Sequence, residues 1–287
     1  MVLSVGASLF DGRFGLADRR PRELVDMPRL ANDRLDPERT HGDVLLSIAS
    51  AHEDHDLFAL RQLMRATRGT MTLRWMLDGF NRRVAAKPGE AGVRNLMGFV
   101  DGTASLDPTD DELMDRFVHV ADDDGEPAWC VGGSYQAVRV VRMFVEFWDR
   151  TRLGEQERLI GRRKRDGAPL DGEAEVDVPD FAADPDGDRT PLDAHIRLAN
   201  PRTPQTEGQR FLRKGFNFSR GFDGAGLLDQ GLAFVSFQHS LQRQFLPVAE
   251  RLAGEPLEEY IRPVGGGFFF TLPGVPDGEF LGERLLT

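Results

Sequence analysis

Cysteine is almost missing from the 287-residue chain, which contains Cys130 and no second thiol. One thiol cannot form a disulfide within the chain, and it cannot supply the paired cysteines of a structural zinc site. Long apolar runs are lacking too, since no stretch approaches the roughly 20 residues that a membrane-spanning helix needs. The sequence therefore predicts neither a disulfide scaffold nor a membrane span.

Positive charge is also scarce, because 36 Lys and Arg residues face 47 Asp and Glu residues, for a net charge of −11. Phosphate binding needs a surplus of basic side chains, so no nucleic-acid partner is expected. The one basic run, at residues 162–165, is interpreted as a solvated helix end. The opening residues MVLSVGASLF lack the charged start and cleavage site of a signal peptide, so the chain as written is expected in the cytoplasm.

Hydrophobic periodicity predicts strands alternating with helices in two sets. Strands are expected at 2–5, 44–48, 71–76, 136–147, 232–238 and 267–272, and helices at 56–66, 155–163 and 241–252, the last kinked by Pro247. Residues 87–94 are expected to form a loop, residues 107–126 a loop with one helical turn, and residues 166–188 an exposed linker or insert. The pattern predicts an α+β protein with halves at 1–165 and 166–287. A doubly wound parallel sheet is the rival, but neither a GxGxxG nor a Walker loop supports it.

Four of the six histidines are compared as candidate ligands. His52 and His55 could share one helix face, but their polar surroundings favour a solvated turn. His239 follows a predicted strand, where capping is the simpler interpretation. His195 lies among apolar residues, so it is either a core histidine or a metal ligand, and its own environment favours the core.

Two charged residues occur in unusual surroundings. Asp101 stands in Gly98-Phe-Val-Asp-Gly102, where glycines permit either a positive φ or the close approach of a bulky group, although for this segment alone an ordinary Asp-Gly turn is the better interpretation. Arg213 lies among large apolar residues, so we expect it to be partly buried beside an anionic partner. No Ser/His/Asp set is recognisable, and a hydrolase with two carboxylates stays open.

Taken together, these segments resemble the dye-decolourising peroxidase family, in particular its bacterial, iron-transport-associated branch. The matching segments are GxxDG at 98–102, HIRLANPR at 195–202, RKGFNF at 213–218, and residues 154–162, 231–238 and 259–270. The resemblance implies two ferredoxin-like units, of the dimeric α+β barrel type, around one b-type haem per chain. His195 would be the iron ligand, and Asp101 and Arg213 would act on the peroxide side.

The resemblance also implies further haem-site residues from both halves. Glu259 would hydrogen-bond the proximal histidine and make it a stronger electron donor. The remaining residues would line the haem and its propionates, and these are Gly102, Thr103, Ala104, Asn200, Pro201, Arg202, Leu232 and Phe234.

The implied activity is reduction of hydrogen peroxide coupled to oxidation of bulky organic donors such as dyes. Peroxide cleavage needs a base that moves a proton between the oxygens and a cation that stabilises the departing charge. Because carboxylic acids ordinarily titrate near pH ~4, an aspartate base predicts an acidic optimum. Surface aromatic residues could relay electrons, although core packing is the simpler interpretation for each candidate: Trp75, Trp129, Trp148, Tyr135 and Tyr260.

Two other functions stay open, namely deferrochelatase-like release of iron from haem and a non-catalytic scaffold. Relatives usually carry an export signal and an opening stretch that would supply the first strand and helix of the first unit. We therefore expect that unit to be incomplete, with an unpaired sheet edge. Export or cytoplasmic localisation, homo-oligomerisation and the reductant are left open.

Overall fold

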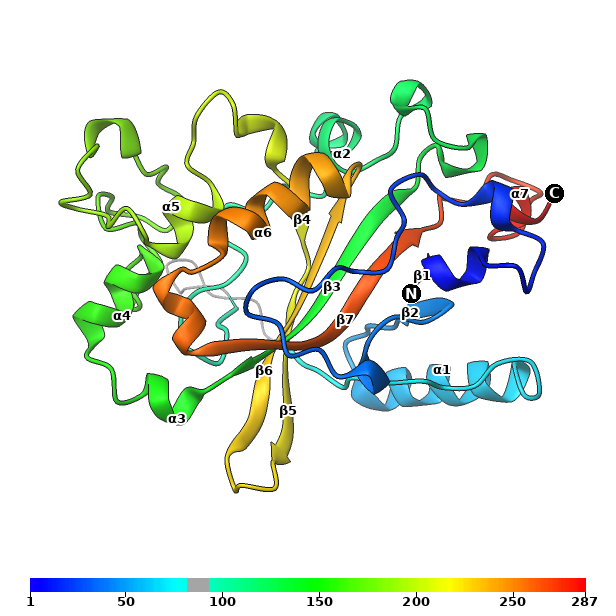
Figure 1. The fold of residues 1–287 in the computed structure, drawn as a ribbon, viewed down its shortest axis with the longest axis horizontal. Helices are drawn as coiled ribbons and strands as arrows, with labels where there is room; N and C mark the ends of the chain where they lie inside the picture. The colour runs from blue at the N-terminus through cyan, green and yellow to red at the C-terminus, as the bar shows by residue number, and fades with distance from the viewer. Residues whose placement is uncertain (82–92) are drawn as a thin grey trace.

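A seven-stranded sheet forms the centre of the protein in a computed structural model that describes residues 1–81 and 93–287 (Figure 1). The strand order is β2-β1-β7-β3-β6-β4, with β5 paired to β6, and each pairing is antiparallel. The strands are β1 (Val2–Gly6), β2 (Val44–Ser47), β3 (Ser134–Met143), β4 (Leu212–Arg213), β5 (Phe216–Phe222), β6 (Leu228–Gln238) and β7 (Ile261–Thr271). The α+β class is confirmed, and the parallel alternative is wrong.

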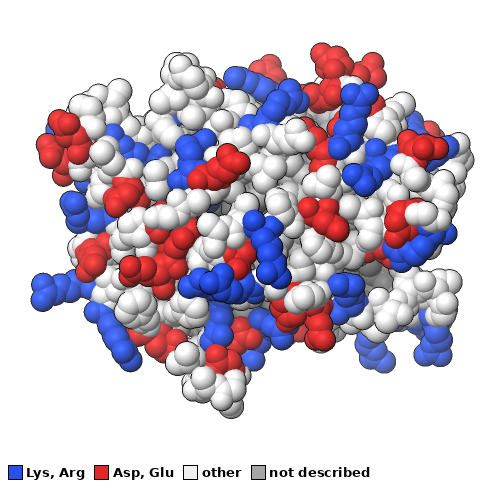
Figure 2. Space-filling model, viewed as in Figure 1, with Lys and Arg blue, Asp and Glu red and all other residues white. Residues whose placement is uncertain are grey.

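Short helices surround this sheet, with α5 against α6 on one side and α1 near β2 on the other side in the view of Figure 1. They are α1 (Glu53–Ala66), α2 (Asp111–Phe117), α3 (Val145–Trp148), α4 (Leu153–Ile160), α5 (His195–Ala199), α6 (Leu246–Leu252) and α7 (Glu283–Leu286). Within the described ranges, no helix combines the length and apolar character that crossing a bilayer requires. Basic and acidic side chains are interspersed on the face shown in Figure 2, without a broad area of one sign.

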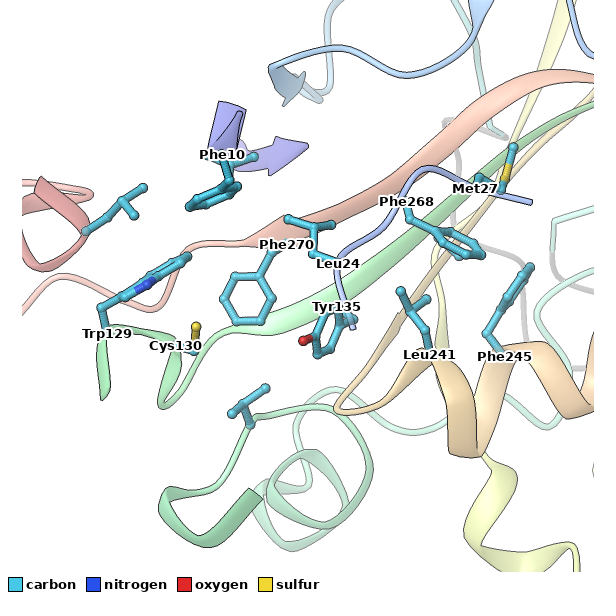
Figure 3. Packing of buried hydrophobic residues seen from close by; sticks show 14 of the residues in the cluster. Phe10, Leu24, Met27, Trp129, Cys130, Tyr135, Leu241, Phe245, Phe268 and Phe270 are labelled. Atoms are coloured by element: carbon cyan, nitrogen blue, oxygen red, sulfur yellow. The ribbon is translucent and has the colours of Figure 1, made fainter. Parts of the chain in front are cut away.

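The central strands are held by aromatic packing on one face of the sheet (Figure 3). The ring of Phe270 in β7 meets Trp129 and Tyr135 edge-on, with centroids 5.2 and 5.0 Å away. Edge-to-face geometry is favourable because the positive ring edge meets the negative ring face. Burial, together with the hydrogen bond from its hydroxyl to Glu126, raises the pKa of Tyr135, so the phenol stays neutral.

Strand β7 begins at Ile261, earlier than the predicted start at Gly267, and it includes the glycine triplet. A Cβ on Gly266 would lie 2.0 Å from the carbonyl oxygen of Val138 in β3. The glycines therefore permit close pairing of β3 and β7 rather than marking a loop before the strand.

The predicted strand at 71–76 is wrong, because the segment has no regular secondary structure. Side-chain bonds hold it in place, since Arg74 Nε donates to the Thr40 carbonyl (3.1 Å) and Trp75 Nε1 donates to the His41 carbonyl (2.7 Å). Its residues alternate as a strand's do, but no ladder pairs them among the described residues. An extended segment becomes a strand only when a neighbour takes its backbone hydrogen bonds.

Other predicted boundaries shift for local reasons. Strand β3 ends at Met143 and gives way to α3, so the strand predicted to 147 is too long. Pro247 lies second in α6, and a π-helical turn (Leu241–Phe245) precedes it where one helix kinked by Pro247 was predicted. Since proline has no N–H to bond the preceding turn, a local irregularity there is expected. Of the loop predicted at 87–94, residues 87–92 lie outside the described residues, and the helical turn predicted within 107–126 is the seven-residue helix α2.

The segment after α4 is not the exposed linker that its Gly, Pro and Asp content predicted. Ala168 is fully buried and Phe181 is 7% exposed. Arg162, predicted to be solvated, is buried and donates from Nη1 to the carbonyls of Gly167 (2.6 Å) and Glu175 (3.0 Å). Backbone carbonyls thus replace water around this guanidinium, and the segment packs against the body of the protein.

Candidate functional site

His195 opens α5 and faces a buried carboxylate. Its Nδ1 lies 2.8 Å from Oε2 of Glu255, whose side chain is 4% exposed, whereas the imidazole itself is 33% exposed. The preceding residue, Ala194, is fully buried, which fixes the start of the helix. The carboxylate sets the tautomer with hydrogen on Nδ1, so that Nε2 presents its lone pair away from Glu255.

Two opposing influences act on the imidazole. Burial lowers the pKa of His195, but the charge of Glu255 and the hydrogen bond to it outweigh burial, so the pKa of His195 is raised overall. The charge of Arg213 lowers this pKa and the charge of Asp101 raises it, both by less than Glu255 does.

Glu259, the acid that the resemblance implied behind the histidine, does not contact it. Glu259 is exposed at the end of a 3-10 turn (Pro256–Glu259), whereas Glu255 precedes that turn and points inward. Acids occur at 255, 258 and 259, and their spacing alone does not show which one is buried. Glu255 is thus the functional candidate that the sequence reasoning missed.

Asp101 and Arg213 lie opposite each other at the end of the GxxDG segment. Arg213 Nη1 is 3.9 Å from Asp101 Oδ1, and Arg213 Nη2 donates to the Thr103 carbonyl at 2.6 Å. The backbone N–H of Arg213 donates to the hydroxyl of Ser105 at 3.0 Å. Both charged side chains stay partly exposed, at 25% for Asp101 and 32% for Arg213, so they face a space rather than a packed core.

The turn after Asp101 has an unusual backbone. Gly102 and Ala104 have φ values of 86° and 60°, and the N–H of Gly102 donates to Asp101 Oδ1 at 2.7 Å. A left-handed alanine costs roughly 1–2 kcal/mol, so outside contacts must stabilise this turn. A Cβ on Gly102 would meet nothing within 4 Å, which places open space beside the turn.

Leu232 and Phe234 supply an apolar surface on one face of β6. They remain partly exposed although β6 is paired on both sides, and the intervening Ala233 is buried. Phe234 contacts the rings of Phe211 and Phe245, with centroids 6.2 Å away in both cases. The pair therefore presents incompletely covered apolar surface near the centre of the sheet.

Arginine side chains influence one another in another part of the site. Arg202, with φ 57°, has a buried Nε without a partner within the described residues, while its backbone N–H donates to Asn200 Oδ1 at 3.1 Å. Burial lowers the pKa of Arg162, and the positive charges of Arg202 and Arg213 lower it further. A buried unpaired donor beside other cations is suited to an anionic group such as a carboxylate. Pro201, which precedes Arg202, is partly exposed, and within the described residues this is the one observation that bears on its predicted place beside the haem.

These residues fit a b-type haem. The oriented imidazole of His195 could bind iron, the apolar pair could meet the porphyrin, and Arg202 could meet a propionate. Among the described residues no cluster of three or more His, Cys, Asp or Glu side chains could hold a metal. One histidine is a poor protein-only metal site, but it is a sufficient protein ligand for haem iron.

The other candidate residues are not part of this arrangement. The rings of His52 and His55 contact each other at 5.1 Å, and both residues are exposed. His239 does not cap the next helix, because the hydroxyl of Ser240 accepts from the N–H of Arg243. The aromatic residues Trp129, Trp148, Tyr135 and Tyr260 are buried, and Trp75 is partly buried.

Two family models match this chain. One, described as the C-terminal part of Dyp-type peroxidase, covers residues 92–276, and the other, described as its N-terminal part, covers residues 1–81. Proteins named deferrochelatase from Shigella sonnei and Escherichia coli are 50% identical over 288 residues, which span all of this chain and 68% of theirs.

Solved structures of similar proteins share the fold. A DyP-type peroxidase from Cellulomonas bogoriensis aligns with a TM-score of 0.90 and 37% identity, covering 99% of this chain and 78% of that one. Ferric DtpA from Streptomyces lividans aligns with a TM-score of 0.91 and 37% identity, covering 99% and 77%.

Proposed function

Because the chain belongs to the Dyp-type peroxidase family, we propose that it is a haem peroxidase that reduces hydrogen peroxide and oxidises bulky organic donors such as dyes. The observation that carries this proposal is the convergence of His195, backed by Glu255, with Asp101 and Arg213 around one site. An oriented imidazole, a carboxylate and a guanidinium are the three groups that this chemistry needs.

One haem b per chain would be held by residues from both halves. His195 would bind the iron through Nε2, because Glu255 occupies Nδ1. Leu232 and Phe234 would contact the ring, and Arg202 would bind a propionate with its buried, unpartnered Nε. When bound, the haem supplies the redox-active iron and the site at which peroxide binds. The contribution of Glu255 is to make the imidazole more basic, which favours oxidised iron.

Asp101 and Arg213 would handle the proton and the charge of the peroxide. One oxygen of Asp101 accepts the proton from the inner peroxide oxygen and returns it to the outer one. Arg213 directs a guanidinium N–H at the outer oxygen and stabilises the negative charge that grows there. The separation of 3.9 Å between Arg213 Nη1 and Asp101 Oδ1 keeps the carboxylate near the guanidinium without a tight ion pair.

The proposal is tested by adding hemin and then peroxide with a dye. A Soret band is expected in the wild-type chain and its loss in His195→Ala. Asp101→Asn is expected to keep the band and to lower peroxide turnover at least 100-fold, as expected for loss of a general base. Dye turnover should have an acidic optimum. An optimum well above neutral, or wild-type turnover in Asp101→Asn, would contradict the assignment of Asp101 as the base.

A bulky dye would need an electron route from the surface. Trp148 and Tyr260 have ring centroids 4.9 Å apart, and Tyr260 stacks on the exposed ring of Phe147. Of the five candidate residues, this pair therefore combines ring contact with proximity to the surface. Trp148→Phe and Tyr260→Phe should lower dye turnover while leaving peroxide consumption with a small donor unchanged. The relay idea fails if neither these nor the other three single replacements affect dye turnover.

A second function, release of iron from haem with the porphyrin left whole, is supported by the 50% identity to proteins named deferrochelatase. It would use the same pocket. Free protoporphyrin, recognised by its fluorescence after incubation with haem without peroxide, would favour it. Quantitative recovery of intact haem would leave the peroxidase as the function.

We further propose that the halves 1–165 and 166–287 are two ferredoxin-like units that contribute jointly to the sheet. Support comes from the α+β architecture and from the sheet, to which the first half contributes β1, β2 and β3 and the second half contributes β4 to β7. Coexpression of the halves as separate chains tests this, since complementary units should assemble and bind hemin together. Failure of the two chains to associate would count against the division at residue 165.

A further inference from the structure

The segment 166–178, named here the strap, crosses the outside of the turn that follows Asp101. Two arginines from the end of α4 hold it by its carbonyl groups. Arg162 donates to Gly167 and Glu175, and Arg163 donates to the carbonyls of Gly172 (2.8 Å) and Glu173 (3.1 Å). The backbone on either side of Glu175 is therefore anchored, which restricts where its side chain can point.

The strap also packs tightly against the catalytic segment. A Cβ on Gly167 would lie 3.0 Å from Cβ of Val100, the residue before Asp101, and 3.2 Å from Cγ of Glu175. Gly167 thus lies between these two side chains, and its φ of +78° adds a second reason for glycine there. The strap cannot move away from the turn without losing this contact.

Glu175 makes one specific bond to the turn. Its Oε1 accepts from the hydroxyl of Thr103 at 3.0 Å, and the carbonyl of Thr103 accepts from Arg213 Nη2 at 2.6 Å. Thr103 stands between Gly102 and Ala104, the two residues with positive φ. The orientation of the Thr103 carbonyl, and with it the position of the Arg213 guanidinium, depends on what holds the Thr103 side chain.

We propose that Glu175 is a positioning residue that holds the Gly102–Ala104 turn and thereby aims the Arg213 guanidinium at the peroxide site. The inference rests on the proposed peroxidase function and extends it to a residue of the strap. Glu175 acts through Thr103, and its carboxylate takes no part in proton transfer. Its loss should therefore affect steps that need Arg213 and leave the His195 side and the organic donor unaffected.

The main test compares Glu175→Ala and Thr103→Val, each of which removes one partner of the bond. Both should lower kcat/KM for peroxide by about tenfold, the effect of one hydrogen bond, and the double variant should be no worse than either single. KM for the organic donor should not change. Glu175→Gln keeps an acceptor and should recover most of the loss. Glu173→Ala, which truncates an exposed side chain on the same strap, is the matched control and should behave as wild type.

Two readouts separate positioning from general damage. Fluoride affinity of the ferric protein, measured by absorbance, should fall by a similar factor in Glu175→Ala, because bound fluoride depends on a distal hydrogen-bond donor. In the chain without haem, hydrogen exchange of residues 101–106 should accelerate in both variants and not in Glu173→Ala. The Ser105 amide, bonded to the Gly102 carbonyl at 3.1 Å, is the expected reporter.

The outcomes are distinguishable. Wild-type peroxide kinetics, fluoride affinity and exchange in Glu175→Ala would overturn the proposal, as would an equal loss in Glu173→Ala. An additive double variant would show that Glu175 and Thr103 act separately, which also overturns it. If the wild-type chain gives no Soret band, the proposed function fails, and the exchange measurement on the haem-free chain still decides whether Glu175 holds the turn.

Discussion

Replacement of Glu255 by glutamine should weaken haem binding, because the structure places this carboxylate 2.8 Å from Nδ1 of His195. Glutamine has nearly the same volume and keeps an acceptor oxygen, so the change removes charge rather than packing. A hydrogen bond to a charged group contributes about 1.5–3 kcal/mol. Loss of such a partner behind a metal-bound histidine typically lowers metal affinity by about 10–100-fold.

The assay is a hemin titration followed at the Soret band, in competition with a haem-binding protein of known affinity. We expect an affinity loss of about 10–100-fold in Glu255→Gln and a higher ferric/ferrous reduction potential, because the imidazole donates less electron density. Glu259→Gln is the matched control, since Glu259 is exposed and four residues away in sequence. Urea unfolding of the haem-free variants checks that both fold.

Two results would refute this reasoning. Wild-type haem affinity in a folded Glu255→Gln variant would show that the hydrogen bond does not support ligation. A larger loss in Glu259→Gln would show that the wrong acid has been placed behind the histidine. His195→Ala sets the lower limit, because a chain without the imidazole should give no ligated Soret spectrum.

Three further predictions concern the sheet that carries the site. Phe270→Ala, which empties a fully buried ring position, should lower the free energy of unfolding by about 3–5 kcal/mol in urea titrations. Gly231→Ala should prevent correct pairing of β3 and β6, because the new Cβ would lie 2.0 Å from a carbonyl oxygen of β3. Gly224→Ala is the control: a Cβ there meets nothing within 4 Å, so this variant should keep the wild-type circular dichroism spectrum and melting curve. The hydrogen bond from Arg142 is the largest cause that lowers the pKa of Asp223. The stabilisation that this bond gives the folded protein is present above the ordinary pKa of aspartate and is lost as the pH falls through the lower pKa of the folded state. The difference in unfolding free energy between wild type and Asp223→Asn should therefore be present at pH 7 and disappear in strongly acidic buffer.

The sequence predicted best those features that depend on local pattern. The β-branched run in β3 and the apolar run in β6 are central strands, and these two strands pair over eight residues from Tyr135 to Arg142. His195, Asp101 and Arg213 are far apart in sequence and give weak signals one at a time, yet the structure brings them together. Their joint spacing was informative because the fold, rather than any one residue, determines the site.

The sequence pattern did not show which side chains tertiary packing would bury. Glu255 and Glu259 have the same side chain and lie just before and at the end of one short turn, but only the buried one, Glu255, contacts His195. Arg162 lies in a basic run that looked solvated, and the strap that covers it looked like a linker. In both cases the residues that bury the side chain come from other segments of the chain, and the composition of one segment does not show which segments pack against it.

The segment 71–76 shows that secondary structure, like burial, depends on neighbours that the local sequence pattern does not reveal. Its alternation is that of a strand, and Met71, Leu73 and Met76 are 56%, 52% and 46% exposed. Alternation measures the capacity of a segment to pair and to bury one face, whereas a ladder needs a second backbone. The alternation therefore indicates that the segment can pair as a strand, and it is not a strand here because no other strand pairs with it among the described residues.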